Sequence, residues 1–373
     1  MPYRVVAIPG DGVGPEVIDA ARRVVDAAGQ RFDFTVEWTE ILAGGAAIDA
    51  YGVAIRPEDV ETCRAADAVL LGAVGGPKWS DPSADVRPEQ ALFALRGGLG
   101  LFANLRPVKV HPALVASSPL RPELLEGVDL LIVRELTGGV YFGDRQEAGE
   151  EKGDRRAVDT MPYSEDEIRR IVLLAGAYAL TRRRRLTSVD KANVLATSRL
   201  WRRVVDEERR RMPDVEVTHQ LVDSCAMLLI RRPADFDVIV TENLFGDILS
   251  DEAAVLAGSL GMLPSASLAD RLTEHGGTFG LYEPIHGSAP DIAGQDRANP
   301  IGTILSAAMM MFSSFKRRDV SEAIEEAVSR ALDKGWRTPD LADARDADDG
   351  LVVVGTTGMA TAVIEALEAA VPA

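Results

Sequence analysis

Two aspartates in the stretch NLFGDILSDEAAVLAG, residues 243–258, have the type and spacing of metal ligands. Asp247 and Asp251 are four residues apart, so on a helix they share one face. Like charges at this spacing repel by about 0.2–0.5 kcal/mol, but near a helix start the dipole offsets this and both can be ordinary end caps. Alternatively, they hold a hard cation such as Mg²⁺ or Mn²⁺, with Asp223 as third ligand. The spacing alone supports either interpretation.

Three arginines stand beside apolar runs. Arg96 ends ALFALR, Arg106 ends LFANLR and Arg134 ends LLIVR. A guanidinium in such surroundings needs an anionic partner because its charge cannot be neutralised. A salt bridge explains each one singly, whereas the three together indicate recognition of a substrate with more than one carboxylate.

Lys191 and Tyr141 are candidates for proton transfer. Only six of the 41 basic residues are lysines, and Lys191 follows an expected strand end. An ammonium titrates where a guanidinium does not, which suits an acid–base role, although five other lysines exist. Tyr141, in TGGVYFGD, is either a proton donor or an ordinary half-buried aromatic residue.

The sequence pattern around these residues predicts βαβ units. Apolar runs of strand length alternate with helical patterns, which predicts an α/β fold with a largely parallel sheet: RVVAI, AVLLGAV, DLLIV and DVIV. Charged residues come directly after several such runs: Arg134, Glu135, Asp190, Lys191, Asp223 and Asp247. Ligands of open α/β sheets bind outside the carboxyl ends of strands, so the set predicts one polar cleft. For any single residue, a polar loop is the simpler explanation.

The opening stretch RVVAIPGDGVGPEV, residues 4–17, looks like a phosphate-binding loop. A dinucleotide fingerprint requires G-x-G-x-x-G followed by an acid, and here Gly14 comes one position early. Glu37 or Glu40 would supply the acid. Pro15 suits the first turn of a helix, so we interpret the glycines as a structural turn.

A second candidate for nucleotide binding is EPIHGSAPDIAGQDRANP, residues 283–300. Asp291 in this segment would accept hydrogen bonds from an adenosine ribose and repel a 2′-phosphate.

The length, composition and charge of the chain limit the kinds of protein that it can be. With 373 residues, of which 46% are hydrophobic and 27% charged, we expect a soluble protein of two domains. The net charge of −17 argues against a nucleic-acid surface, and we interpret the run RRRR, 182–185, as a solvated helix end. The sequence shows neither a membrane span of ~18 apolar residues nor a signal peptide, so we expect a cytoplasmic protein. Cys63 and Cys225 are read as inert thiols, and the histidines lack zinc-ligand spacing.

Six motifs, in order along nearly the whole chain, resemble the isocitrate/isopropylmalate family of β-decarboxylating dehydrogenases, and within it the group that acts on 3-isopropylmalate. They are GGPKW (75–79), LRGGLGLFANLRP (95–107), RELTGGVYFG (134–143), DKANVL (190–195), TENLFGDILSDEAAVLAGSLGM (241–262) and EPIHGSAPDIAG (283–294). None is specific alone, but collectively they are.

The resemblance implies the two-domain α/β fold of that family, with a mixed sheet and no Rossmann domain. A first, NAD-binding domain would combine residues 1–101 with 258–373. A second, dimer-forming domain would span 102–257, with an arm near 134–160. Homodimers of the family share their active sites, so Lys191 and Asp223 would reach the partner's site. The opening loop would then be scaffold.

The implied reaction converts 3-isopropylmalate to 4-methyl-2-oxopentanoate and CO₂ with reduction of NAD, in leucine biosynthesis. Substrate carboxylates would bind to Arg96, Arg106 and Arg134. Mg²⁺ or Mn²⁺ would be held by Asp247, Asp251 and Asp223, the last also touching substrate. Lys191, through water, would help remove the hydroxyl proton as hydride passes to NAD, and Tyr141 would protonate carbon after CO₂ leaves.

Further contacts also follow from the resemblance. Leu92 and Val194 match positions that line the isopropyl pocket, but Phe93 stands where a second leucine is expected and would narrow that pocket. The implied NAD contacts are Gly76, Glu89, His286, Gly287, Ser288, Ala289, Pro290, Asp291 and Asn299, with Asp291 favouring NAD over NADP.

Three alternatives stay open. The nearest is the same fold acting on D-malate, tartrate or homoisocitrate. A Rossmann 2-hydroxyacid dehydrogenase would need no metal and would use the opening glycines. A non-catalytic ligand-binding protein would bind substrate without producing NADH.

Overall fold

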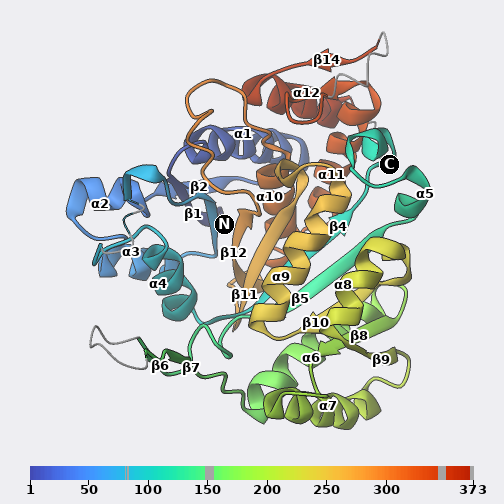
Figure 1. Ribbon diagram of the computed structural model, residues 1–373. Helices are drawn as coiled ribbons and strands as arrows, with labels where there is room; N and C mark the ends of the chain where they lie inside the picture. Colours follow the sequence, from blue (N-terminus) through green and yellow to red (C-terminus); the bar gives the residue numbers. More distant parts are fainter. Residues whose placement is uncertain (80, 82–83, 148–154, 343–349, 370–373) are drawn as a thin grey trace. The chain divides into compact units, whose positions relative to one another are not determined.

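The computed structural model describes residues 1–79, 81, 84–147, 155–342 and 350–369 (Figure 1). The chain divides into two compact units. The first comprises Met1–Leu101, Val110–Pro119 and Ala254–Ala373, and the second comprises Phe102–Lys109 and Leu120–Ala253. The second domain expected from the sequence, 102–257, differs from this division at 110–119 and at its end, since both of these segments belong to the first unit.

The first unit has a mixed sheet. Its strands, in spatial order, are β2 (Val36–Glu40), β1 (Tyr3–Gly10), β3 (Ala68–Ala73), β12 (Thr278–Pro284) and β11 (Pro264–Leu272). The first four run parallel, and β11 is antiparallel to β12. All six residues of β3 are buried, which explains why AVLLGA is continuously apolar.

Helices cover both faces of this sheet. On one face, Ile8 and Leu71 pack into a core with Leu95 of α4 (Gln90–Leu99) and Cys63 of α3 (Pro57–Ala65). On the other face lie α1 (Gly14–Phe32) and α10 (Ile301–Ser313), which contact β1 and β12 (Figure 1). Two further helices pack behind them: α11 (Arg318–Asp333) and α12 (Thr356–Glu368).

The strands of the second unit are also mixed in direction. Its strands, in spatial order, are β4 (Leu101–Lys109), β5 (Asp129–Glu135), β10 (Val238–Thr241), β8 (Arg185–Asp190) and β9 (Glu216–Leu221). The last four run parallel, and β4 is antiparallel to β5. Its main helices are α6 (Glu165–Leu180), α7 (Ala196–Glu208), α8 (Val222–Arg231) and α9 (Asn243–Ala254). The S-x-x-E signature at Ser164 and Glu167 forms a capping box that starts α6.

The carboxyl ends of the parallel strands in the second unit are aligned. Thr241 of β10 lies beside Arg134 of β5 and Val189 of β8, and Asp190 lies beside Leu221 of β9. Because α8 and α9 begin directly after β9 and β10, Asp223 in the first turn of α8 and Asp247 in the second turn of α9 follow this edge. The strand ends of this unit are thus aligned as expected, while the polar cleft at this edge stays a prediction.

The opening loop is a strand-to-helix turn. Strand β1 ends at Gly10, α1 begins at Gly14, and Pro15 lies in its first turn. The N–H groups of Asp11 and Val13 donate to the carbonyls of Ala73 and Ser288, both at 2.8 Å. These donors are unavailable to a phosphate, which agrees with the interpretation of the glycines as a structural turn.

The run 182–185 follows the end of α6 at Leu180, and Arg183, Arg184 and Arg185 are exposed, as the interpretation of a solvated helix end expected, whereas Arg182 is half-buried. Arg182 pairs with Asp129 at 2.6 Å and with the buried Asp237 at 2.9 Å. Arg182 therefore fixes the start of β8 against β5 and the segment before β10. The expected excursion at 143–160 carries a short hairpin of β6 (Arg145–Gln146) and β7 (Val158–Asp159), and its residues 148–154 lie outside the described part.

Within the described residues, the longest apolar stretches of helix are too short or too polar to cross a membrane. Both cysteines are free and buried, and burial raises the pKa of the Cys63 thiol to about 12.

Candidate active site

The two aspartates of α9 each bind an arginine that a strand of the same unit supplies. Asp251 accepts from Nη1 of Arg106, on β4, at 3.0 Å. Asp247 Oδ1 pairs with Nη1 of Arg134, on β5. Burial alone would favour the neutral acid, but the charges of Arg134 and Arg106 and a hydrogen bond from Tyr141 outweigh it and lower the pKa of Asp247. Two carboxylates, one helical turn apart, are thus set against two fixed cations.

Tyr141 belongs to the same cluster. Its hydroxyl donates to Oδ2 of Asp247 at 2.5 Å, and the guanidinium of Arg134 lies 5.5 Å from the centre of its ring. Burial, reinforced by the hydrogen bond to the carboxylate, raises the pKa of Tyr141. The phenol therefore keeps its proton at neutral pH.

Arg134 is held in a single orientation. It is 2% exposed, and its Nε and Nη2 donate to the amide oxygen of Asn243 at 3.0 and 2.8 Å. A Cβ at position 246 would lie 2.6 Å from Cγ of Arg134, so Gly246 makes room for the arginine beside α9. Neither Asn243 nor Gly246 was predicted as a site residue, although both lie in the motif that contains the aspartates.

A buried carboxylate caps the start of α9. Glu242, 3% exposed, accepts from the N–H groups of Leu244 and Phe245 at 3.0 and 2.6 Å. Burial raises the pKa of Glu242. Tyr163 donates to it at 3.4 Å and accepts from the N–H of Asn243 at 3.0 Å.

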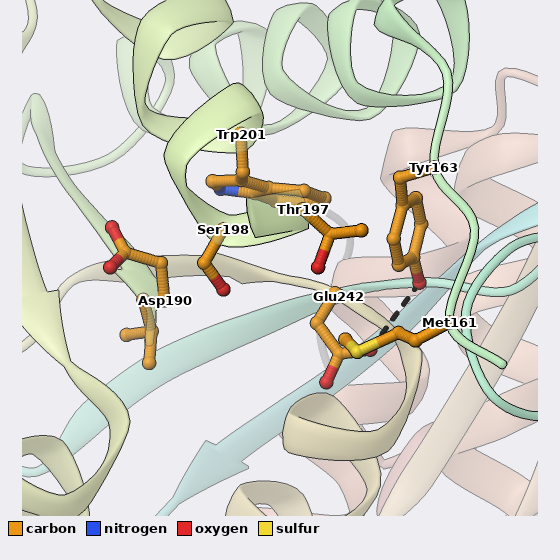
Figure 2. Close-up of a pocket in the computed structure, with 8 residues that line it drawn as sticks. Met161, Tyr163, Asp190, Thr197, Ser198, Trp201 and Glu242 are labelled. Carbon is orange, nitrogen blue, oxygen red and sulfur yellow. Dashed lines mark hydrogen bonds between the residues drawn. The ribbon is translucent and has the colours of Figure 1, made fainter. Parts of the chain in front are cut away.

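Figure 2 shows that these two side chains line a small cavity. Thr197, Ser198 and Asp190 also line it, and the carboxylate of Asp190 is turned away from Tyr163 and Glu242. Its volume of about 10 Å³ fits roughly one water molecule. The cavity is too small for a diacid. Two of its lining residues, Glu242 and Tyr163, hold the start of α9 through the hydrogen bonds given above.

Lys191 and Asp223 form a second cluster. Nζ of Lys191 lies 2.8 Å from Oδ1 of Asp223, and this hydrogen bond lowers the pKa of the aspartate. The backbone of Lys191 is fixed because its N–H donates to Ser198 at 3.0 Å, and the preceding Asp190 pairs with Arg202 at 2.9 Å.

The structure does not bring Asp223 to the aspartates of α9 within one chain. Among the described residues, no three His, Cys, Asp or Glu side chains lie together closely enough to hold a metal ion. The expected set of Asp223, Asp247 and Asp251 is therefore split between the two clusters of a single copy.

Except for Val194, the remaining candidates lie in the first unit. Arg96, on α4, is 3.7 Å from Glu283, and its buried Nε has no hydrogen-bond partner among the described atoms. Glu89 precedes α4 and is exposed, Leu92 is half-buried, and Phe93 is 44% exposed. In the second unit, Val194 is 62% exposed.

The segment expected to bind NAD also lies in the first unit. His286 donates from Nδ1 to the carbonyl of Gly287 at 2.9 Å, and its buried Nε2 has no partner among the described atoms. Burial lowers the pKa of His286, so the ring is neutral and Nε2 is an acceptor. Asp291 is exposed. The amide of Asn299 is engaged, since it bonds the N–H of Ile301 at 3.0 Å and Asp340 at 3.1 Å.

Comparisons with known proteins cover almost the whole chain. The sequence profile of the isocitrate/isopropylmalate dehydrogenase family matches residues 4–363. A 3-isopropylmalate dehydrogenase of Moorella thermoacetica is 55% identical, covering 98% of this chain and 99% of that relative. One of Aquifex aeolicus is 51% identical over 98% of this chain and 97% of that relative. The crystal structure of an isocitrate dehydrogenase from Methylococcus capsulatus superposes with a TM-score of 0.83 at 33% identity, covering 98% of this chain and 99% of that structure.

Proposed function

Because this chain belongs to the isocitrate/isopropylmalate dehydrogenase family, we propose that it oxidises and decarboxylates 3-isopropylmalate to 4-methyl-2-oxopentanoate and CO₂ while NAD is reduced, as a step of leucine biosynthesis. The observation that carries the choice of substrate is the identity of 51–55% to relatives of that name over nearly their full length. The cluster of Arg134, Asp247 and Tyr141 supports the chemistry.

The substrate carboxylates bind to Arg96, Arg106 and Arg134 in this proposal. The last two are permanently charged and already bind carboxylates of the protein. When a diacid reaches these two arginines, its carboxylates replace the carboxylates of the protein as their partners. The charge of each arginine is therefore balanced both with and without substrate. An arginine also offers paired donors that match the geometry of a carboxylate.

The metal site consists of Asp247, Asp251 and Asp223 of the partner subunit. Carboxylate oxygens are the ligands that Mg²⁺ and Mn²⁺ prefer. The lowered pKa of Asp247 and of Asp223 keeps both ionised, as metal ligands must be. When bound, such a cation supplies positive charge that stabilises the anionic oxygen of the substrate as CO₂ leaves.

Protons pass through Lys191 and Tyr141. Lys191, through water, takes the proton of the C2 hydroxyl, and NAD, when bound, would supply the acceptor for the hydride that leaves C2. After the C–C bond to the carboxylate breaks, the phenol of Tyr141 donates its proton to the carbon that CO₂ has left. The raised pKa of Tyr141 keeps that proton in place until it is needed. Lys191 acts in the partner's site together with Asp223, to which it is bonded.

NAD binds to the first unit. The unpartnered Nε2 of His286 fits the amino group of an adenine, and the exposed Asp291 fits a ribose diol and repels a 2′-phosphate. Since the side chain of Asn299 is already engaged, its contact would come from the backbone. The other proposed contacts are Gly76, Glu89, Gly287, Ser288, Ala289 and Pro290.

The shared site requires a homodimer. Met227 on α8 and Ile248 on α9 are 61% and 57% exposed, which supports an apolar contact between copies on these helices. We place the enzyme in the cytoplasm.

Phe93 favours a second candidate substrate. An exposed aromatic ring next to Leu92, where a leucine is expected, leaves less room for an isopropyl group and favours the smaller D-malate.

The test is a panel of initial rates with 3-isopropylmalate, D-malate, isocitrate and homoisocitrate, each with NAD or NADP and with Mg²⁺. We expect the largest kcat/KM for 3-isopropylmalate with NAD. A larger value for D-malate would replace the proposed substrate, and Phe93→Leu should then shift the ratio toward 3-isopropylmalate.

A further inference from the structure

The carboxylate of Asp11, in the opening loop, binds three backbone N–H groups. Its Oδ2 accepts from Gly45 and Gly75, and its Oδ1 from Ala46, each at 2.8 Å. The side chain is 5% exposed, so these charge-assisted bonds are shielded from water. Gly75 has φ of +106° and directly precedes Gly76, one of the proposed NAD contacts. Asp11 thereby fixes the first NAD-binding segment.

The same loop contacts the second NAD-binding segment at Ser288. The N–H of Val13 donates to the Ser288 carbonyl at 2.8 Å. Gly12 has φ of +58°, and a Cβ there would lie 1.9 Å from that carbonyl oxygen. Only glycine allows the loop to approach so closely.

Glu16, in the first turn of α1, holds the far end of the second segment. Its Oε1 accepts from the N–H of Gly294, and its Oε2 from that of Asp296 at 3.1 Å. Gly294 and Asp296 both have positive φ, so the chain turns tightly just after Asp291. The carboxylate stabilises this turn.

We propose that residues 10–16 are a brace that holds the two NAD-binding segments at a fixed separation, and that Asp11 and Glu16 are positioning residues for the cofactor. The proposal rests on the proposed NAD site. The two segments are far apart in sequence, and the brace contacts both within the first unit. The loop that resembles a phosphate cradle would then serve the cofactor indirectly, through carboxylates and close backbone contacts.

Asp11→Asn is the sharpest test because it preserves size. An amide has one oxygen, whereas the three N–H donors use both carboxylate oxygens, so the NH₂ group must face at least one donor. We expect the Kd for NADH, measured by fluorescence, and the KM for NAD to rise about tenfold or more. The KM for 3-isopropylmalate should stay within about twofold.

Glu16→Gln is a second variant on the protein surface, where folding is less at risk. It should raise the same two constants by a smaller factor. Asp59→Asn is the matched control, since Asp59 is a buried carboxylate of α3 in the same unit that pairs with Arg56. It should lower Tm and leave NADH affinity unchanged.

The outcomes separate the two proposals. Wild-type protein that binds no NADH would overturn the proposed function and the brace together. Normal NADH binding by wild-type protein and by both variants would overturn the brace alone. Equal increases in the KM for NAD and the KM for 3-isopropylmalate would also overturn it, because a general loss of structure does not select the cofactor.

Discussion

The amide oxygen of Asn243 accepts two hydrogen bonds from Arg134, at 3.0 Å from Nε and 2.8 Å from Nη2. This fixes the plane of the guanidinium and leaves Nη1 directed at Asp247. Asn243 is the first residue of α9, and Asp247 lies one turn further along the same helix. A single short helix therefore orients the proposed substrate-binding cation and carries a proposed metal ligand.

Asn243→Leu should raise the KM for 3-isopropylmalate about 10–100-fold, because two hydrogen bonds to a charged group are lost and Arg134 is freed to rotate. The KM for NAD should not change. Steady-state kinetics with each substrate varied in turn gives both values, and Gln30→Leu, at an exposed position of α1, controls for the amide-to-leucine change. An unaltered KM for 3-isopropylmalate would remove Asn243 from substrate positioning.

Lys191→Met should abolish turnover while NADH still binds, since methionine keeps the length of the side chain but can neither take nor give a proton. NADH fluorescence titration and initial rates are measured on the same preparation. Lys334→Met, at an exposed position after α11, should keep wild-type rates. Turnover at the wild-type rate in Lys191→Met would exclude Lys191 from the mechanism.

Asp291→Lys should weaken the preference for NAD, because an ammonium replaces the carboxylate that we propose to repel a 2′-phosphate. The ratio of kcat/KM for NAD to that for NADP measures this preference. Asp270→Lys introduces the same change of charge at another exposed position of the first unit and should leave the ratio unchanged. If Asp291→Lys also leaves it unchanged, the segment assigned to the adenosine ribose is incorrect.

The positions of many candidate site residues on strands and helices can be predicted from the local sequence pattern. The side chains that hold them in place cannot. Charged residues that come directly after apolar runs correctly predicted Arg134 and Lys191 at strand ends. The spacing of Asp247 and Asp251 predicted that both lie on one face of a helix. The partner of Arg134, however, lies 109 residues away in sequence, and a polar residue at a helix start does not reveal which side chain it meets. Arg182 was misread for the same reason, because Asp129 and Asp237 come from distant segments.

The opening loop shows a second limit. Glycine spacing excluded the dinucleotide fingerprint, but positive φ and close approach look alike in sequence whether the neighbour is a phosphate or a carbonyl. Only the contacts of Gly12 with Ser288 and of Asp11 with Gly75 distinguish the two.

Asp67 should make the free energy of unfolding decrease as pH falls into the acid range. Burial favours its neutral form, but bonds from the side chain and backbone of Arg4 outweigh burial and lower the pKa of Asp67. A carboxyl whose pKa is lower in the folded state stabilises the fold above its unfolded pKa of about 3.9 and loses that contribution as pH falls through the folded value.

Asp67→Asn should therefore lower the free energy of unfolding at pH 7 by about 1–2 kcal/mol, discounted because Arg4 is partly exposed. The difference from wild type should shrink as pH falls below about 4. Urea unfolding at both pH values measures it. A constant difference across this range would mean that the charge of Asp67 contributes nothing.

The most direct test of the proposed chemistry measures NADH and CO₂ in one reaction of the purified protein with 3-isopropylmalate, NAD and Mg²⁺. We predict one CO₂ for each NADH, no formation of either after EDTA treatment, and recovery of both when Mg²⁺ or Mn²⁺ is restored. NADH formed without CO₂, or an undiminished rate in EDTA, would contradict the assignment of Asp223, Asp247 and Asp251 to a cation that promotes decarboxylation.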